Sequence, residues 1–252
     1  MGKLGLQLYS IKDAAKEDFL GVLEKVANMG YEGAQFAGFF DHTATEVKVK
    51  MDEVGIKAAG AHIQIEEVKD DFDKLLSYHD TIDNRLLICP YLPESMRTTE
   101  DDYKRTAELF NNVGEKLAKA GFSFGYHNHA FEFDLFNGKS GFELLYENTD
   151  PQLVKMELDC FWAADAGFSP VGIIEKYADR CVSLHIKDLK LVDGNPVSTE
   201  IGTGTLDIPQ LIKAGKEHQV DWFIVEQEDF TGDPVVSAAK NATELKRVIE
   251  QS

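Results

Sequence analysis

Eight short apolar runs of strand length recur along this chain, and each is followed by an amphipathic stretch with the period of a helix. The runs occupy residues 5–10, 31–38, 56–64, 85–92, 122–129, 153–161, 181–188 and 221–228. Strict alternation of strands and helices implies a parallel sheet with right-handed crossovers. Eight such units in 252 residues predict an α/β protein that closes into a (β/α)8 barrel, as a single domain over residues 1–252. An open doubly wound sheet is the alternative, but no glycine-rich phosphate fingerprint follows the first run.

The composition excludes several classes of partner. The formal net charge is −18 and the pI is about 4.7, whereas proteins meet a phosphate backbone or an anionic membrane with clustered Lys and Arg. No signal peptide or long apolar segment is seen, so we expect a soluble, cytoplasmic protein without nucleic-acid or membrane partners. Cys89, Cys160 and Cys181 lie in separate apolar runs and are expected to be buried free thiols. A homodimer is expected only because it is the commonest oligomer.

Polar side chains gather at the carboxyl ends of the predicted strands, where the active sites of such barrels lie. They are Gln7, Tyr9, His62, Gln64, His127, His129, Glu132, Glu157, Asp159, His185, Lys187 and Glu226. Isolated carboxylates are costly to bury, so convergent carboxylates indicate a cation or a paired base among them. Oxygen ligands with a single imidazole suit Mn²⁺ or Mg²⁺, with Co²⁺ or Zn²⁺ as alternatives. The competing explanation is that Glu157, Lys155 and Lys187 neutralise one another within the barrel.

Five motifs narrow the identity of the chain: YHNHAFEF, ELDCFWAADAG, SLHIKD, EIGTGTLDIPQLI and FIVEQE. In this order and on successive strands, they resemble the sugar phosphate isomerase/epimerase family of the xylose isomerase-like TIM barrels. The resemblance covers the chain from GLQLYS onward, and it implies one divalent metal ion, Mn²⁺ in the first place, at the ends of the fifth to eighth strands. The positions that match its ligands are Glu132, Asp159, His185 and Glu226. The residues expected to bind substrate are Gln7, His62, His127, His129, Trp162 and Lys187.

One residue departs from the family pattern. Epimerases of free ketoses in this superfamily commonly carry a histidine three residues after the metal-binding aspartate, whereas Trp162 follows Asp159 here. An aromatic ring stacks on the apolar face of a sugar instead of hydrogen-bonding a hydroxyl. This difference suggests a larger or differently oxidised carbohydrate.

The expected function is that of a metal-dependent sugar isomerase or epimerase. The ion would stabilise an enediolate, while Glu132 and Glu226 would remove and return the proton α to the carbonyl. The alternatives are a lyase or dehydratase that eliminates from a 3-keto-glycoside or an inosose, and a catalytically silent carbohydrate-binding barrel. The expected substrate is a small unphosphorylated sugar or keto sugar, although the loop IGTGT at residues 201–205 could offer backbone amides to an anion.

Overall fold

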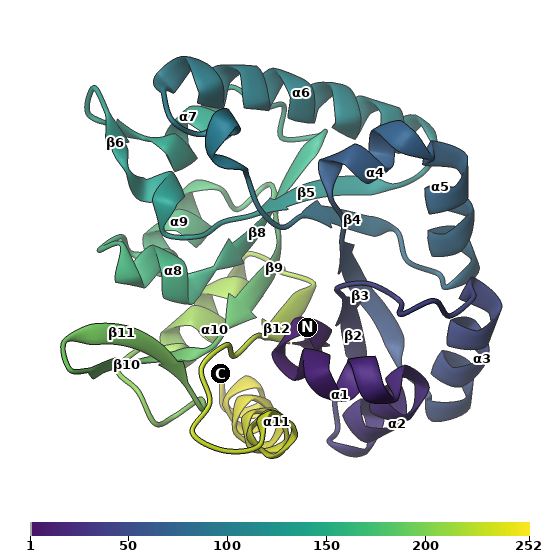
Figure 1. Cartoon of the computed structure of the whole chain (residues 1–252). Coiled ribbons are helices and arrows are strands. Elements are labelled where there is room, and N and C mark those ends of the chain that lie inside the picture. The colour runs from purple at the N-terminus through teal and green to yellow at the C-terminus, as the bar shows by residue number, and fades with distance from the viewer. Residues whose placement is uncertain (1) are drawn as a thin grey trace.

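The eight predicted strands form one closed parallel barrel in the computed structural model, which describes residues 2–252 (Figure 1). The strands are β1 (Lys3–Gln7), β2 (Gly33–Phe36), β3 (Lys57–His62), β4 (Leu86–Cys89), β5 (Ser123–His127), β8 (Val154–Asp159), β9 (Cys181–Ile186) and β12 (Trp222–Val225). The barrel closes where β1 pairs with β12, from Lys3 opposite Trp222 to Leu6 opposite Val225. The predicted (β/α)8 fold is therefore confirmed.

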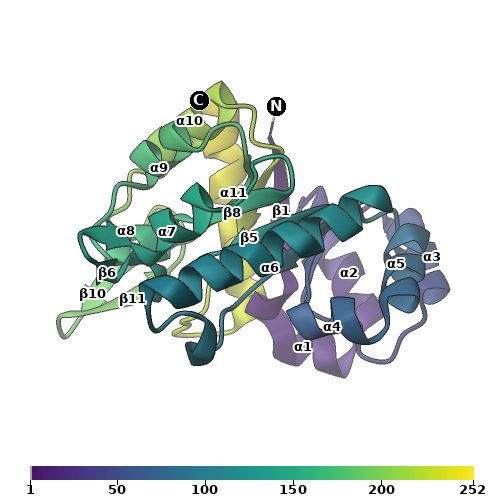
Figure 2. The same ribbon diagram turned by 90° about the horizontal axis from the view of Figure 1, so that it is seen from above.

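Helices surround the barrel, as Figure 1 and the view from above in Figure 2 show. They are α1 (Lys12–Glu17), α2 (Phe19–Asn28), α3 (Ala44–Val54), α4 (Ile65–Asp70), α5 (Phe72–Thr81), α6 (Glu100–Lys119), α7 (Gly141–Glu147), α8 (Cys160–Asp165), α9 (Pro170–Lys176), α10 (Ile208–Glu217) and α11 (Pro234–Gln251). Three single 3₁₀ turns join them, η1 (Leu8–Ile11), η2 (Glu94–Met96) and η3 (Phe131–Phe133). Within residues 2–252, no helix is both long and apolar enough to cross a membrane.

The long helix α6 shows how the sequence specifies these elements. It begins with a capping box in which Thr99 and Asp102 satisfy each other's backbone N–H groups. Its apolar face packs on the barrel, where the Phe110 ring lies 5.2 Å from Phe124 of β5. Just beyond its end, Gly121 adopts a φ of +83°, the left-handed conformation that ends a helix at little cost for glycine.

Two antiparallel hairpins are added to the loops after β5 and β9, and the strand pattern did not predict them. They pair β6 (Leu135–Phe136) with β7 (Lys139–Ser140), and β10 (Asp188–Val192) with β11 (Asn195–Thr199). Their tips are Asn137-Gly138 and Asp193-Gly194, and all four residues have positive φ. A type I′ hairpin turn requires positive φ at both central residues, and Asn-Gly and Asp-Gly are among the residue pairs that it favours.

Candidate active site

Four side chains bring ligand atoms together at the carboxyl ends of neighbouring strands: His127, Asp159, His185 and Glu226. All four are buried, and these atoms all lie within 4.8 Å of one another. His185 Nδ1 is 2.9 Å from Glu226 Oε2, and His127 Nε2 is 3.7 Å from Asp159 Oδ2 and 4.0 Å from Glu226 Oε2. Strand register explains the grouping, because Asp159 lies opposite His185 across β8 and β9 and Glu226 directly follows β12. We call these four residues the outer group.

The structure does not bring Glu132 to this group, although the sequence predicted it as a metal ligand. Its side chain is fully buried at η3. The carboxylate accepts hydrogen bonds from the Tyr126 hydroxyl and, at 2.8 Å, from the backbone N–H of His129. Burial raises the pKa of Glu132 to about 8 despite these two bonds. His127 on β5 takes the place that Glu132 was expected to fill.

Lys187 supplies positive charge to the acidic side of the outer group. Its Nζ lies 2.8 Å from Asp159 Oδ2, 3.4 Å from Glu226 Oε2 and 2.6 Å from Glu228 Oε1. Burial alone would lower the pKa of Lys187, but these carboxylates raise it above its usual value. The residue was expected to contact substrate, yet it is fully buried. Its ammonium instead neutralises the oxygens that a metal ion would bind.

An inner layer, centred on Glu157 of β8, holds the histidines in place. Glu157 Oε1 lies 2.7 Å from His62 Nε2, 3.0 Å from His185 Nε2 and 3.3 Å from His127 Nδ1. Glu157 Oε2 accepts hydrogen bonds from Gln35 Nε2 at 2.5 Å and Ser183 Oγ at 2.7 Å. Burial opposes ionisation, but the surrounding histidines hold the pKa of Glu157 well below its usual range.

The inner layer decides which nitrogen of each histidine faces the outer group. His185 Nε2 lies 2.7 Å from Gln35 Oε1 and 3.0 Å from Glu157 Oε1, so a proton is retained on Nε2. Nδ1, 2.9 Å from Glu226 Oε2, is then the nitrogen that a metal ion could bind after Nδ1 loses its own proton. His127 Nδ1 lies 3.3 Å from Glu157 Oε1 but has no hydrogen-bond partner among residues 2–252, and its Nε2 faces Asp159. A carboxylate behind each imidazole is the usual support of a metal-binding histidine.

Two other expectations concern the inner layer. Lys155 donates to the backbone oxygen of Pro151 at 2.8 Å, and Lys187 pairs with other carboxylates, so Glu157 is not neutralised by lysines. Gln7, expected to bind substrate, is fully buried. It donates to Gln35 Oε1 at 2.7 Å and accepts from the N–H of Tyr9. Gln7 therefore orients Gln35, which in turn donates to Glu157.

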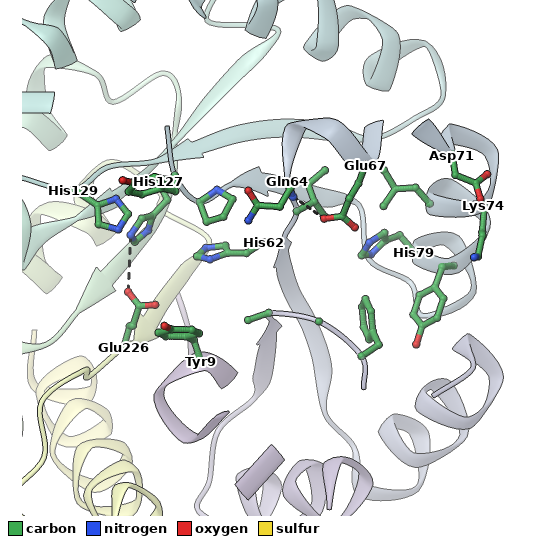
Figure 3. A pocket seen from close by; sticks show the side chains of 18 of the residues that line it. Tyr9, His62, Gln64, Glu67, Asp71, Lys74, His79, His127, His129 and Glu226 are labelled. Carbon is green, nitrogen blue, oxygen red and sulfur yellow. Dashed lines mark hydrogen bonds and ion pairs between the residues drawn. The ribbon is translucent and has the colours of Figure 1, made fainter. Parts of the chain in front are cut away.

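A cavity of about 800 Å³ opens onto the site (Figure 3). At its inner end lie Tyr9, His62, His127, His129, Glu226 and Glu228. The three histidines, all expected to contact substrate, therefore line this cavity, and their contact with a substrate stays a prediction. Trp162 is not among the lining residues, and its ring lies 6.0 Å from that of His129. Trp162 Nε1 and His129 Nδ1 are buried without a hydrogen-bond partner among residues 2–252.

His129 is neutral at physiological pH. Burial lowers the pKa of His129 to about 3. Its ring stacks on Phe131, with 5.4 Å between centroids and an interplanar angle of 7°. A neutral imidazole held in this way donates or accepts a hydrogen bond without adding charge to the cavity.

The glycine-rich loop 201–205 has its amides occupied by a side chain. The buried carboxylate of Asp188 accepts from the N–H groups of Gly202 at 3.0 Å, Gly204 at 2.9 Å and Leu206 at 3.0 Å. The backbone amides that could have received an anion are therefore used to fold the loop onto β10.

The comparisons with known proteins agree with this architecture. A family model described as xylose isomerase-like TIM barrel matches residues 23–251. An inosose dehydratase of Geobacillus kaustophilus is 25% identical over 254 aligned residues, which cover 86% of this chain and 81% of the relative. Among solved structures, a sugar phosphate isomerase/epimerase from Parabacteroides distasonis is 26% identical with a TM-score of 0.84, covering 99% of this chain and 96% of the other. A D-psicose 3-epimerase from Clostridium cellulolyticum shares the fold at 17% identity, with a TM-score of 0.74 and 98% and 99% coverage. The chain belongs to the xylose isomerase-like TIM barrel family.

Proposed function

We propose that the protein is a divalent-metal-dependent enzyme that removes a proton α to the carbonyl of a keto sugar or inosose. The observation that carries this proposal is the convergence of four ligand atoms, all within 4.8 Å of one another. His127, Asp159, His185 and Glu226 would hold the ion. Two imidazole nitrogens, instead of the one expected, suit Mn²⁺, Co²⁺ or Zn²⁺ better than Mg²⁺. When bound, the ion would act as a Lewis acid that stabilises negative charge on the substrate oxygen.

Glu226 is the group best placed to take the proton. It is the one residue of the predicted catalytic pair that lines the cavity. Burial would raise the pKa of Glu226, but the charges of His185 and Lys187 hold it well below its usual range. The carboxylate is therefore ionised and ready to accept a proton at neutral pH. His62 and His129, on the wall of the same cavity, would orient the substrate hydroxyls by hydrogen bonds.

The position of Glu132 favours elimination over epimerisation. Two-base epimerisation needs a second acid on the opposite face of the substrate, and Glu132 is instead engaged by Tyr126 and His129. Elimination needs one carboxylate. Glu226 takes the proton from the carbon, the C–O bond on the neighbouring carbon breaks, and protonated Glu226 returns the proton to the departing oxygen to form water. A dehydration also agrees with the name of the relative that is 25% identical over 86% of this chain.

Isomerisation or epimerisation is the second candidate. It is favoured by the solved structure named sugar phosphate isomerase/epimerase, which is 26% identical over 99% of this chain. Both candidates begin with the same proton removal, and they differ in whether the substrate then loses water or regains a proton on carbon. They can therefore be separated in one experiment.

The test is incubation of the Mn²⁺-loaded protein in D₂O with an inosose, a panel of ketoses and 3-keto-glycosides, followed by NMR. Loss of water, or of the aglycone alcohol from a 3-keto-glycoside, supports elimination, whereas deuterium gained α to the carbonyl without loss of either group supports the isomerase or epimerase. Either reaction should be abolished in Glu226→Gln and retained in Glu217→Gln, a change at the exposed end of α10, which precedes β12 and so lies at the opposite end of the barrel from the site. A protein that binds metal and sugar yet exchanges no proton with any ketone would be a silent binding barrel, and the proposal would be wrong.

A further inference from the structure

The cavity extends well beyond the residues proposed to perform chemistry. Its outer lobe is formed by Phe39, Glu67, Lys74, Leu75, Tyr78 and His79, from the loop after β2 and from α4 and α5. Figure 3 shows Glu67, Lys74 and His79 on the side away from His127, His129 and Glu226, with His62 and Gln64 between. The whole cavity, about 800 Å³, lies in the upper part of the range of roughly 300–1,000 Å³ typical for drug-sized ligands. A single sugar or cyclitol ring at the inner end leaves the outer lobe unfilled.

An aromatic wall lines the outer lobe. The Phe39 and Tyr78 rings lie 4.3 Å apart between centroids, and Phe39 also makes an edge contact with His79 at 5.6 Å. Tyr78 is anchored because its hydroxyl donates to the backbone oxygen of His42 at 2.8 Å. Rings fixed in this way present a rigid apolar surface, which suits the apolar face of a six-membered ring.

His79 presents a hydrogen-bond donor in this wall. The Asn84 amide is oriented by the backbone of Leu86, to which its Nδ2 donates at 3.1 Å and from which its Oδ1 accepts at 3.3 Å. Asn84 Nδ2 must therefore also donate to His79 Nδ1, 3.0 Å away, and the neutral ring carries its proton on Nε2. Nε2 has no hydrogen-bond partner among the described side chains, although His79 is 1% exposed and lines the cavity.

Charged groups complete the edge of the outer lobe. Lys74 is exposed and forms no ion pair within the described part of the chain. Glu67 uses Oε1 to accept from the backbone N–H of Gln64 at 2.7 Å, which leaves Oε2 available. Donors and an acceptor around an aromatic surface match a ring that bears hydroxyl groups better than a bare hydrocarbon.

From these features we infer that the substrate is a glycoside with a second sugar ring, and not a free monosaccharide. The reactive ring lies at the inner end beside Glu226, and the second ring lies in the outer lobe, against Phe39 and Tyr78 and within reach of His79 and Lys74. This inference rests on the proposed function for the role of the inner end. The residues and contacts that form the outer lobe do not depend on the proposed function.

Turnover and binding test the inference separately. We expect kcat/KM of the metal-loaded enzyme for 3-keto-cellobiose to exceed that for the 3-keto form of methyl glucoside by about tenfold, the factor for one stacking contact and one hydrogen bond. Lys74→Ala and His79→Phe should each lower kcat/KM for 3-keto-cellobiose several-fold, by raising KM. Neither should change kcat/KM for the methyl glycoside by more than about twofold. Lys74→Ala keeps the test valid if His79→Phe fails to fold, because Lys74 is an exposed residue.

Calorimetric titration with cellobiose, phenyl glucoside and methyl glucoside measures binding affinity independently of turnover. Cellobiose should bind most tightly, and both substitutions should weaken it toward methyl glucoside. Equal binding and equal kcat/KM for cellobiose and methyl glucoside derivatives would overturn the inference while proton exchange still supported the proposed function. Tighter binding of phenyl glucoside than of cellobiose would overturn the assignment of a sugar ring. Preferential cellobiose binding without any ketone turnover would uphold the outer lobe and refute the proposed function.

Discussion

Replacement of Glu157 by glutamine tests whether the inner layer prepares the outer group for a metal ion. The carboxylate is fully buried and faces five nitrogen or oxygen atoms of Gln35, His62, His127, Ser183 and His185. Glutamine has nearly the same shape, but only one of its two terminal atoms is an acceptor. The substitution therefore changes hydrogen bonding and charge with little change in packing.

Either orientation of the new amide creates a conflict. If its NH₂ replaces Oε2, it faces Gln35 Nε2, and Gln35 cannot turn because its Oε1 already accepts from Gln7 Nε2 and lies 2.7 Å from His185 Nε2. If its NH₂ replaces Oε1, it faces His185 Nε2 and favours the tautomer with the proton on Nδ1, the atom directed at the outer group. Loss of such a supporting carboxylate typically weakens metal binding by about 10–100-fold, or about 1.4–2.7 kcal/mol.

The assay is calorimetric titration of metal-free protein with Mn²⁺ at neutral pH. Ser183→Ala is the matched control, because it removes one donor to the same carboxylate but keeps the charge and the histidine tautomers, and it should change affinity much less than Glu157→Gln. Circular dichroism must show that both variants are folded. A folded Glu157→Gln protein that binds Mn²⁺ as tightly as the wild type would refute the reasoning.

Three further outcomes are expected from the contacts of individual residues. Burial would lower the pKa of His185, but Glu157 and Glu226 raise it to about 10. Metal binding at neutral pH should therefore release a proton and strengthen as the pH rises toward 10, and titrations in buffers of different ionisation enthalpy that show no release would contradict this. Burial lowers the pKa of His79 from 6.5 to about 4, so it contributes stability that is present above pH 6.5 and lost as the pH falls to 4, about 3 kcal/mol in all. In urea unfolding, the free energy of unfolding of His79→Phe should not show this loss at low pH. If the free energies of the wild type and the variant change in parallel with pH, the explanation is wrong. A Cβ at Gly204 would collide with Asp188 Oδ1 and the Leu189 backbone oxygen, so Gly204→Ala should cost about 1–3 kcal/mol and lower the melting temperature by about 2–4 °C per kcal/mol. An unchanged melting temperature would show that the loop can shift.

The barrel could be predicted because its signal is local and repeated. Each strand is a short apolar run and each helix has its own period, so eight independent segments indicate the same topology. The hairpins have an equally local signal in Asn137-Gly138 and Asp193-Gly194, but their strands are short and mix exposed with buried residues without regular alternation. The turn residues could have indicated the hairpins, but the sequence prediction relied on periodicity, which could not.

The candidate site likewise has residues that the sequence could predict and residues that it could not. Asp159 and His185 end their strands or nearly so and Glu226 directly follows β12, so parallel register places them together and the sequence predicted all three. Glu132 lies five residues past the end of β5, in η3, where the loop conformation and not the register decides the direction of the side chain. The contact between Gln35 and Glu157 joins strands on different sides of the barrel, 122 residues apart in sequence. No local pattern marks such a contact.

The carboxylates of the two layers differ in their hydrogen bonds and in their access to the cavity, and this difference supports the proposed role of Glu226. Glu157 is held by so many donors, with its pKa well below the usual range, that it cannot exchange protons with a substrate. Asp159 Oδ1 accepts from the N–H groups of Phe161 and Trp162 at 2.9 and 3.0 Å, and its Oδ2 pairs with Lys187. Glu226 combines a place in the outer group with access to the cavity. Among the carboxylates of the two layers, access to the cavity therefore supports the proposal that Glu226 carries the proton, and a single proton carrier would suit elimination from a β-hydroxy ketone better than inversion of a carbon centre.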